Sequence, residues 1–332
     1  MKQPVLLSLF LIYLCACSSQ AGNEKASSLY QYHLDNDWPH LPENFIIGNV
    51  TGVDVDTFGN ILIFHRATRE WRSVMPKNFI ADKTIIEIDK STGKLINSWG
   101  NSTFIMPHGL TVDYDNNVWV TDIGLQQVFK FSHDGKLLMK LGEARIGGTD
   151  SLHFDMPTSV AVAKDGSFYI ADGYGNSRIM KFSAAGKFLF QWGKKGSGDG
   201  EFQVPHDIAL DNNGNVYVAD RENKRIQIFD STGKFLKALT NKTFGRMYSV
   251  AIDTKNNTIL ATDYISTITE TKGSDIIIFD SSGTILNRFG KSGNYNGPVC
   301  RYHNIAIDKQ SNIFVGDLLE NRIQEFKSHS KE

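Results

Sequence analysis

Three histidines, His108, His206 and His303, stand 98 and 97 residues apart in the sequence. Such nearly equal spacing suggests that a repeated fold brings the three imidazoles to one point. Three imidazole ligands leave one coordination position open, which is the arrangement of a catalytic zinc site. The alternative is that three unrelated polar side chains line a wet channel. Because the three occupy one position in alternate copies of a repeat, we favour the metal site.

The repeat that would position these histidines is clearest at residues 205–236. Four short runs rich in β-forming residues are separated there by the turns Asp-Asn-Asn-Gly and Asp-Ser-Thr-Gly. This pattern predicts a four-stranded antiparallel meander. Copies of the repeat begin at six positions, which are Thr51, His108, Thr158, His206, Tyr248 and His303.

Repeats that start 42 to 57 residues apart, with four strands each, predict the blades of a propeller. We therefore expect an all-β fold, a six-bladed β-propeller. A solenoid is the alternative, but six nearly equal units favour a closed ring. The last blade has only three strands before the polar tail 327–332. We expect the run Asn44 to Ile47 to supply its fourth strand by pairing with residues 322–326.

Residues that recur in every blade are expected to serve packing, and departures from the pattern are candidates for function. The recurring acids at the ends of the second strands are therefore interpreted as loop anchors, and they are Asp122, Asp172, Asp220, Asp263 and Asp317. The arginines that recur near the third strands are interpreted in the same way, and they are Arg178, Arg225 and Arg322.

Arg66, Tyr174 and Arg221 follow second strands at points where the blades differ, and a long loop to about Lys83 follows Arg66. The first strand of an antiparallel blade starts at the edge where the second strand ends. These three residues should therefore surround the mouth that contains the histidines. The alternative for each is an ordinary surface loop residue.

The N-terminus predicts export. An apolar run from Val5 to Leu14 follows Lys2, and it is too short to span a bilayer but fits a signal-peptide core. It continues to Cys17 in a way that resembles the bacterial lipoprotein box. We expect a signal peptide at 1–17 with lipidation of Cys17, a polar tether at 18–40 and the propeller at 41–332. The protein would be a cell-envelope lipoprotein, and cleavage after Ala21 with plain secretion is the alternative.

The composition is that of an ordinary globular protein, with 41% hydrophobic residues and a formal net charge of -1. No long run of Lys or Arg is present, so nothing indicates binding to nucleic acid. If Cys17 carries lipid, Cys300 is the only other cysteine after processing and no internal disulfide can form. The domain must then be held together by its core, and we expect a monomer.

Several stretches resemble the NHL repeat and, more specifically, the peptidyl-α-hydroxyglycine α-amidating lyases, which form the lyase domain of peptidylglycine α-amidating monooxygenase. The stretches that carry this resemblance include Ile63–Arg66, Pro107–Leu110, Asp172–Tyr174, Val204–His206 and Ala219–Asn223. The resemblance extends from about residue 52 to residue 326, which is nearly the whole predicted propeller.

The resemblance implies zinc on His108, His206 and His303, a catalytic tyrosine at Tyr174, and contacts from Arg66 and Arg221 to the substrate. It also implies a calcium ion near the axis at positions that match Val53, Leu110 and Asn304. The family has an acidic residue at the last of these positions. Because the chain has Asn304 there, preceded by Arg301, Tyr302 and His303, we expect little negative charge and weak calcium binding.

The implied reaction splits a peptidyl-α-hydroxyglycine into a peptide amide and glyoxylate. Zinc would stabilise negative charge on the hydroxyl oxygen. Tyr174 would act as the base if a neighbouring cation, which we expect to be Arg66, favours its ionised form. Arg221 would hold the glycine carboxylate. Two other functions stay open, because a fold does not fix a function: a non-catalytic propeller that binds a peptide or glycan at the mouth, and another metal-dependent hydrolase or lyase.

Overall fold

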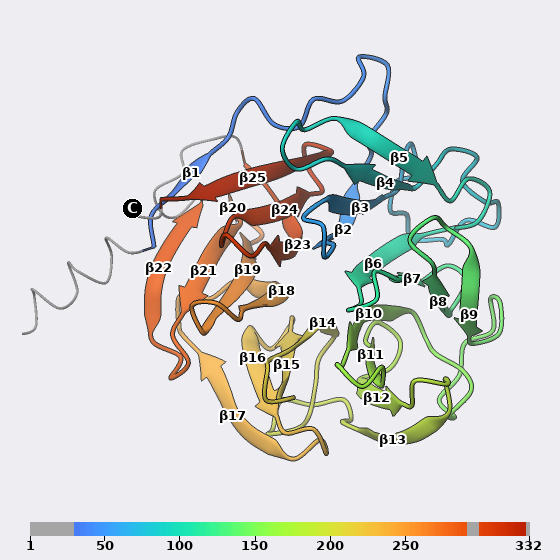
Figure 1. Ribbon diagram of the computed structural model, residues 1–332. Coiled ribbons are helices and arrows are strands. Elements are labelled where there is room, and N and C mark those ends of the chain that lie inside the picture. The colour runs from blue at the N-terminus through green and yellow to red at the C-terminus, as the bar shows by residue number, and fades with distance from the viewer. Residues whose placement is uncertain (1–29, 291–298, 330–332) are drawn as a thin grey trace, which may run out of the picture.

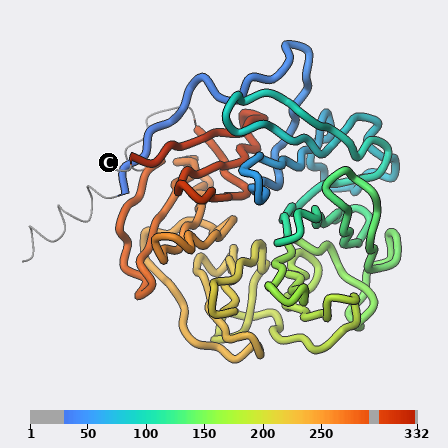
Figure 2. Tube along the Cα trace, in the orientation of Figure 1, coloured from blue at the N-terminus to red at the C-terminus, as the bar shows by residue number. Residues whose placement is uncertain are grey.

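The computed structural model describes residues 30–290 and 299–329, and these residues form six antiparallel sheets arranged in a ring (Figure 1). The chain passes once around this ring from its N-terminal to its C-terminal part (Figure 2). The prediction of a six-bladed β-propeller is therefore confirmed. None of the described residues forms a helix that could cross a lipid bilayer.

Blades one to three each consist of four consecutive strands, numbered from the axis outward. Blade one contains β2 (Val50–Val55), β3 (Ile61–His65), β4 (Ile85–Ile88) and β5 (Leu95–Trp99). Blade two contains β6 (Pro107–Val112), β7 (Val118–Asp122), β8 (Gln127–Phe131) and β9 (Leu137–Leu141). Blade three contains β10 (Pro157–Val162), β11 (Phe168–Asp172), β12 (Arg178–Phe182) and β13 (Phe188–Trp192).

Blades four to six continue the pattern, with an added short strand in blade five and a closing strand in blade six. Blade four contains β14 (Pro205–Leu210), β15 (Val216–Asp220), β16 (Arg225–Phe229) and β17 (Phe235–Thr240). Blade five contains β18 (Arg246–Asp253), β19 (Thr258–Ser266), β21 (Asp275–Phe279) and β22 (Ile285–Gly290), and β20 (Thr271–Gly273) pairs with β19. Blade six contains β23 (Tyr302–Ile307), β24 (Ile313–Asp317), β25 (Arg322–Ser328) and β1 (Tyr32–Leu34).

The core lies between the blades, because a single four-stranded sheet cannot cover its own two faces. In β15 all five residues are buried, whereas the outermost strand β13 alternates between half-buried and exposed residues. One hydrophobic cluster joins β3 to β7 across the contact of blades one and two, with Leu62, Phe64, Val118 and Val120 buried in it. Similar clusters fill the other five contacts. This packing fixes the innermost strands around the axis.

The ring is closed by a different segment from the one predicted. The strand β1 pairs with β25 in antiparallel register, with Tyr32 opposite Ser328 and Leu34 opposite Phe326. The expectation that Phe45 to Ile47 forms this strand is wrong. Phe45 and Ile47 instead pack against the cluster between blades six and one. The propeller therefore begins near residue 32, inside the segment that we had interpreted as a tether.

The recurring acids act as loop anchors, as predicted. Both carboxylate oxygens of Asp122 accept hydrogen bonds from main-chain N–H groups, including those of Ile105 and Gly124. In blade four the fully buried Asp220 forms an ion pair of 2.8 Å with Arg225. Removal of one partner would leave the other charge buried without compensation. These pairs therefore hold the loops that lead to the mouth of the propeller.

Candidate metal centre and substrate pocket

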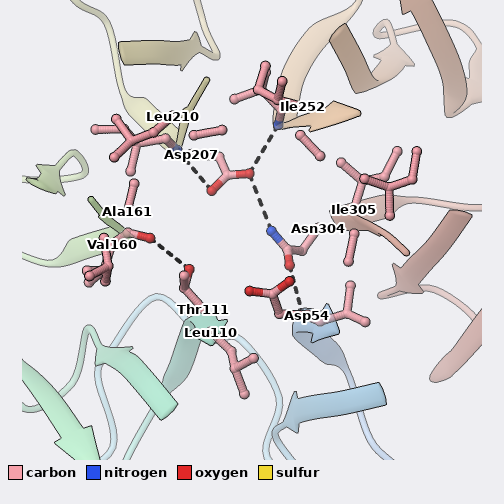
Figure 3. Close-up of a pocket in the computed structure, with 18 of the residues that line it drawn as sticks. Asp54, Leu110, Thr111, Val160, Ala161, Asp207, Leu210, Ile252, Asn304 and Ile305 are labelled. Carbon is pink, nitrogen blue, oxygen red and sulfur yellow. Dashed lines mark hydrogen bonds between the residues drawn. The ribbon is translucent and has the colours of Figure 1, made fainter. Parts of the chain in front are cut away.

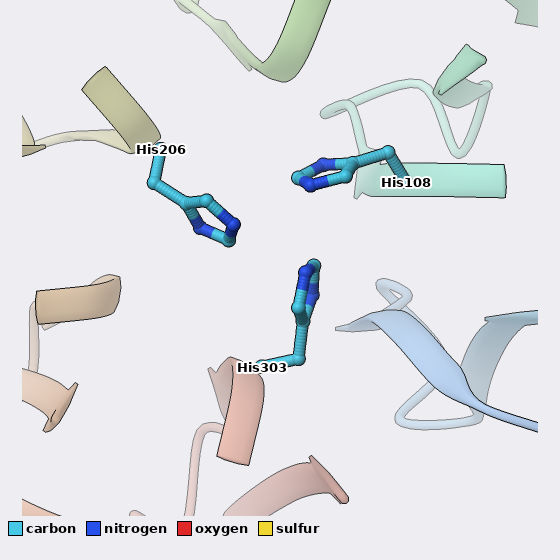
Figure 4. Close-up of side chains that lie close together, drawn as sticks. All are labelled: His108, His206 and His303. Atoms are coloured by element: carbon cyan, nitrogen blue, oxygen red, sulfur yellow. The ribbon is translucent and has the colours of Figure 1, made fainter. Parts of the chain in front are cut away.

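The three histidines meet on the axis of the propeller (Figure 4). Each lies near the start of an innermost strand, His108 in β6, His206 in β14 and His303 in β23. Their ring centroids are 4.7 to 4.8 Å apart, so the triangle they form is nearly equilateral. All three side chains are buried. The alternation that the sequence suggested therefore brings the imidazoles together.

The second nitrogen of each ring is held by the next blade. The Nδ1 atom of His108 lies 2.7 Å from the carbonyl oxygen of Thr158, and that of His206 lies 2.7 Å from the carbonyl oxygen of Tyr248. The Nδ1 atom of His303 lies 2.8 Å from the carbonyl oxygen of Thr51. A carbonyl oxygen only accepts, so each Nδ1 carries a proton and each Nε2 keeps its lone pair. Such a contact is the usual support of a histidine that binds a metal.

Each histidine is thus oriented by a main-chain carbonyl group of the next blade, which itself has no histidine at this position. Thr51, Thr158 and Tyr248 occupy the same repeat position as the histidines, in blades one, three and five. This division of roles was not predicted from the sequence, because main-chain carbonyl groups leave no signature in residue type.

Burial keeps the three imidazoles neutral. It lowers the pKa of His108 to about 3, and it holds the pKa values of His206 and His303 well below the usual value. A histidine must be neutral to bind a metal. The ligand atoms of the three residues lie within 4.8 Å of one another. Three converging Nε2 lone pairs in a buried triangle fit the donor set of a zinc site with an open position.

The hydroxyl group of Tyr174 lies beside this triangle. Its oxygen is 3.1 Å from Nε2 of His108 and 3.1 Å from Nε2 of His206. Nη1 of Arg221 donates a hydrogen bond of 3.1 Å to the same oxygen. Burial raises the pKa of Tyr174 and outweighs the opposite effect of the arginines, of which Arg221 has the larger effect and Arg66 the smaller.

The structure thus corrects one expectation about the neighbouring cation. Arg221, rather than Arg66, contacts the Tyr174 hydroxyl, and its guanidinium carbon also lies 5.0 Å from the centre of the Tyr174 ring. Arg66 is buried beside the three histidines, and its Nε donates to the carbonyl oxygen of Pro107 at 3.0 Å. Burial lowers the pKa of Arg66 to about 10. The sequence could not show which arginine contacts Tyr174, because Arg66 and Arg221 both follow the second strand of a blade.

A pocket of about 420 Å³ opens above the histidines on the side of the Tyr174 loop. The expected residues Arg66, Tyr174 and Arg221 all line it, so the structure brings them together. The lining residues that sequence reasoning missed are Asn49, Trp71, Tyr248, Arg301, Leu318 and Leu319. Trp71 comes from the long loop after Arg66, and its ring lies 5.5 Å from that of Tyr174. A tryptophan within the inserted loop was the sequence signal that could have indicated this lining residue.

A second hollow of about 200 Å³ lies on the axis beyond the histidines, lined by Val53, Leu110 and Asn304 (Figure 3). The Oδ1 atom of Asn304 accepts a hydrogen bond of 2.8 Å from the main-chain N–H of Val53. Its Nδ2 atom donates to Oγ of Ser249 at 3.1 Å and to Oδ2 of Asp207 at 3.3 Å. Protein partners thus satisfy both ends of the amide. Calcium binding at these positions stays a prediction of the resemblance, and these contacts do not favour it.

The structure adds two acidic side chains that the expectation of little negative charge at this level did not include. Asp207 is buried and follows His206 directly, and Asp54 lines the same hollow. Burial raises the pKa values of both carboxyl groups, that of Asp54 to about 6. The sequence contained a signal for this acid. Asp207 follows His206 just as Asn304 follows His303 two blades further on. Cys17, the predicted lipidation site, lies outside the described residues.

Comparisons with known proteins extend the resemblance. The model of the NHL repeat family matches residues 154–182 and 202–229. The probable peptidyl-α-hydroxyglycine α-amidating lyase of Caenorhabditis elegans is 35% identical over 304 residues, which cover 85% of this chain and 83% of that protein. Peptidyl-glycine α-amidating monooxygenase B of Xenopus laevis is 37% identical over 320 residues, 90% of this chain but 36% of the relative. The chain thus spans about a third of the longer relative.

Among solved structures, a gluconolactonase from Xanthomonas campestris superposes with a TM-score of 0.60. The two share 12% sequence identity, and the match covers 85% of this chain and 88% of the other. At this identity the likeness concerns the propeller fold alone.

Proposed function

Because the chain belongs to the peptidyl-α-hydroxyglycine α-amidating lyase family, we propose that it is a zinc-dependent lyase that converts a peptidyl-α-hydroxyglycine into a peptide amide and glyoxylate. One observation carries the proposal: three neutral histidines direct Nε2 toward one point, and the hydroxyl of Tyr174 lies 3.1 Å from two of these atoms. His108, His206 and His303 would hold the zinc ion. When bound, zinc supplies a positive charge that stabilises the substrate oxygen as it loses its proton.

The proposed reaction moves one proton. The hydroxyl group of the substrate gives up its proton, its oxygen becomes the carbonyl oxygen of glyoxylate, and the C–N bond breaks with its electron pair on nitrogen. The nitrogen then takes up a proton and becomes the amide, so atoms and charge balance. In its ionised form Tyr174 would accept the first proton and return it to nitrogen, since general acid–base groups act at hydrogen-bond distance.

Arg221 would serve both Tyr174 and the substrate. Its hydrogen bond to the phenol oxygen opposes the rise in the pKa of Tyr174 that burial causes. Arg66 adds a second buried positive charge at the floor of the pocket. A planar guanidinium binds a carboxylate through two parallel hydrogen bonds. The glycine carboxylate of the substrate would therefore lie between these arginines, and its hydroxyl group would point toward the histidines.

The direct test measures glyoxylate release from a blocked peptide that ends in α-hydroxyglycine. We expect release by the wild-type protein, none from the same peptide ended in glycine, and a large loss in a Tyr174→Phe variant. A Lys187→Gln variant, which alters an exposed turn between β12 and β13, serves as the control and should keep full activity. If the wild-type protein binds the peptide but releases no glyoxylate with zinc saturating, a peptide-binding propeller replaces the proposal.

We also propose that the protein is exported and held at the membrane by lipid on Cys17. The apolar run before this cysteine supports the proposal, and the mass of the mature N-terminus tests it.

A further inference from the structure

Arg301 lies at the rim of the substrate pocket, two residues before His303. Its guanidinium group lies over the rings of two tyrosines, 5.4 Å from the centre of Tyr248 and 5.0 Å from the centre of Tyr264. Its Nη2 and Nε atoms are 2.7 and 3.3 Å from the hydroxyl oxygen of Tyr248. The two rings hold the guanidinium in place, so it is positioned before any ligand arrives.

This guanidinium keeps unused donors. Arginine has five N–H donors, and only Nε and Nη2 contact the one oxygen of Tyr248. Within residues 30–290 and 299–329, Nη1 of Arg301 donates no hydrogen bond and no acid forms an ion pair with this side chain. A tyrosine hydroxyl is a neutral partner, so the charge of Arg301 is not compensated.

The whole mouth carries an excess of positive charge. Arg66 has no ion pair with an acid of the described chain either. Arg221 and Arg246 share one carboxylate, that of Glu222, at 2.9 Å each. Three guanidinium groups thus line the pocket, those of Arg66, Arg221 and Arg301, and none of its lining residues is an acid. Such a site attracts anions and binds them more strongly than water-exposed charges would.

The proposed substrate explains only part of this charge. Its single carboxylate, that of the hydroxyglycine, would be bound by Arg221 and Arg66. Arg301 is left over, and it lies on the same tyrosine as Arg221, whose guanidinium carbon is 5.2 Å from the centre of the Tyr248 ring. Two arginines on one ring define two anion positions that lie close together in the same pocket.

We propose that Arg301 forms a second anion subsite, so that the protein prefers substrates with an acidic group on the acyl side of the hydroxyglycine. This inference rests on the proposed function. The substrate class is a peptide with Asp or Glu directly before the hydroxyglycine. The side-chain carboxylate of such a residue can lie roughly 7 Å from the glycine carboxylate, because one residue of backbone spans about 3.5 Å and the side chain adds a similar length. The guanidinium carbons of Arg221 and Arg301 lie 5.2 and 5.4 Å from the same ring centre, so both carboxylates of one such substrate can reach them.

The test compares blocked dipeptides that differ in one group, N-acetyl-Glu-α-hydroxyglycine and N-acetyl-Gln-α-hydroxyglycine. For wild-type protein we expect a kcat/KM for the Glu substrate about ten to a hundred times that for the Gln substrate, as for a charge-assisted hydrogen bond. In an Arg301→Gln variant the ratio should fall to about one. Arg301→Lys should restore part of the ratio, and the Lys187→Gln control should keep it in full.

A binding measurement separates this proposal from the proposed function. Calorimetry with unreactive N-acetyl-Glu-Gly and N-acetyl-Gln-Gly reports the subsite without any chemistry. If Glu binds more tightly and Arg301→Gln removes the difference, the subsite stands even when no glyoxylate is released. Equal affinity for the two ligands in the wild-type protein would overturn it. An Arg301→Gln variant that binds both ligands more weakly to the same extent would also overturn the subsite, because Arg301 would then act only by holding Tyr248.

Discussion

Replacement of Asn304 by aspartate should make the stability of the propeller depend on calcium. Nδ2 of Asn304 donates to Oδ2 of Asp207 at 3.3 Å, deep on the axis. In the Asn304→Asp variant an oxygen takes the place of this donor, and two carboxylates face each other in a buried hollow. The change restores the acid expected from the family resemblance. In this chain, however, the new acid faces a second one, Asp207.

The size of the effect follows from this distance. Two unit charges 3.3 Å apart repel by about 5 kcal/mol at an effective dielectric constant of 20. The pair avoids this repulsion by retaining a proton, which costs about 1.4 kcal/mol for each pH unit above the usual carboxyl pKa, or about 4 kcal/mol at pH 7. A shared proton restores part of the lost hydrogen bond. We therefore expect a loss of about 2–4 kcal/mol at pH 7, or about 5–10 °C in Tm.

The loss should depend on pH in one direction. The folded variant keeps a proton that the unfolded chain releases above pH of about 4, so its stability falls relative to wild type as pH rises from about 4 to 7. Burial already raises the pKa of Asp207 in the wild-type protein, so it also favours retention of a proton in the folded state. Calcium should reverse the loss, because it binds carboxylate oxygens and neutralises both charges.

The assay is thermal unfolding at several pH values, in a chelator and in millimolar calcium. The matched control is the double variant Asp207→Asn with Asn304→Asp, which keeps one acid and one amide and should recover most of the stability without calcium. Wild-type protein should respond little to calcium. If Asn304→Asp unfolds at the wild-type temperature in chelator at pH 8, the two side chains do not face each other as described.

Four further predictions concern the site and the frame. Tyr174→Phe should lower kcat about 10²- to 10⁴-fold with a smaller change in KM, as measured by glyoxylate release; an unchanged kcat would exclude Tyr174 as the acid–base group. Purified wild-type protein should hold about one zinc per chain by elemental analysis, and His206→Ala should hold much less; equal zinc in both would argue against the triad. Arg225→Met should lower the free energy of unfolding in urea by about 3–5 kcal/mol, because Asp220 would keep a buried charge, and wild-type stability would show that the pair is not an anchor. Mass spectrometry should find lipid on Cys17, whereas an unmodified N-terminus at Gly22 would indicate secretion.

The sequence was most informative where the repeat was regular. The six strand starts could be aligned by residue type, and the alternation of His108, His206 and His303 then followed from the geometry of a closed ring. The acids that anchor the loops were recognised for the same reason, because a residue that recurs in several blades, as Asp220 does, must serve something that recurs in the fold.

Predictions failed where contacts join segments that are far apart and do not repeat. Tyr32 to Leu34 closes the ring because it reaches β25, and its three residues carry no pattern that distinguishes them from the run Phe45 to Ile47. The contact of Arg221 with Tyr174 depends on the direction of side chains in two loops. Asp207 could not be predicted from Asn304 alone, because its carboxyl group comes from β14, a strand on another side of the axis.

The pairing of β1 with β25 joins the two ends of the described chain. The main-chain N–H of His329 donates to the carbonyl oxygen of Gln31 at 2.9 Å, and Asp35 pairs with Lys327, 292 residues away. Closing a loop of this length costs about 5 kcal/mol of chain entropy, whereas contacts within a blade close loops of only tens of residues. We therefore expect the ring to close last during folding and to open first at blade six, which supplies His303. A chain with its ends joined by a short linker and new termini cut in another surface turn should keep all six sheets.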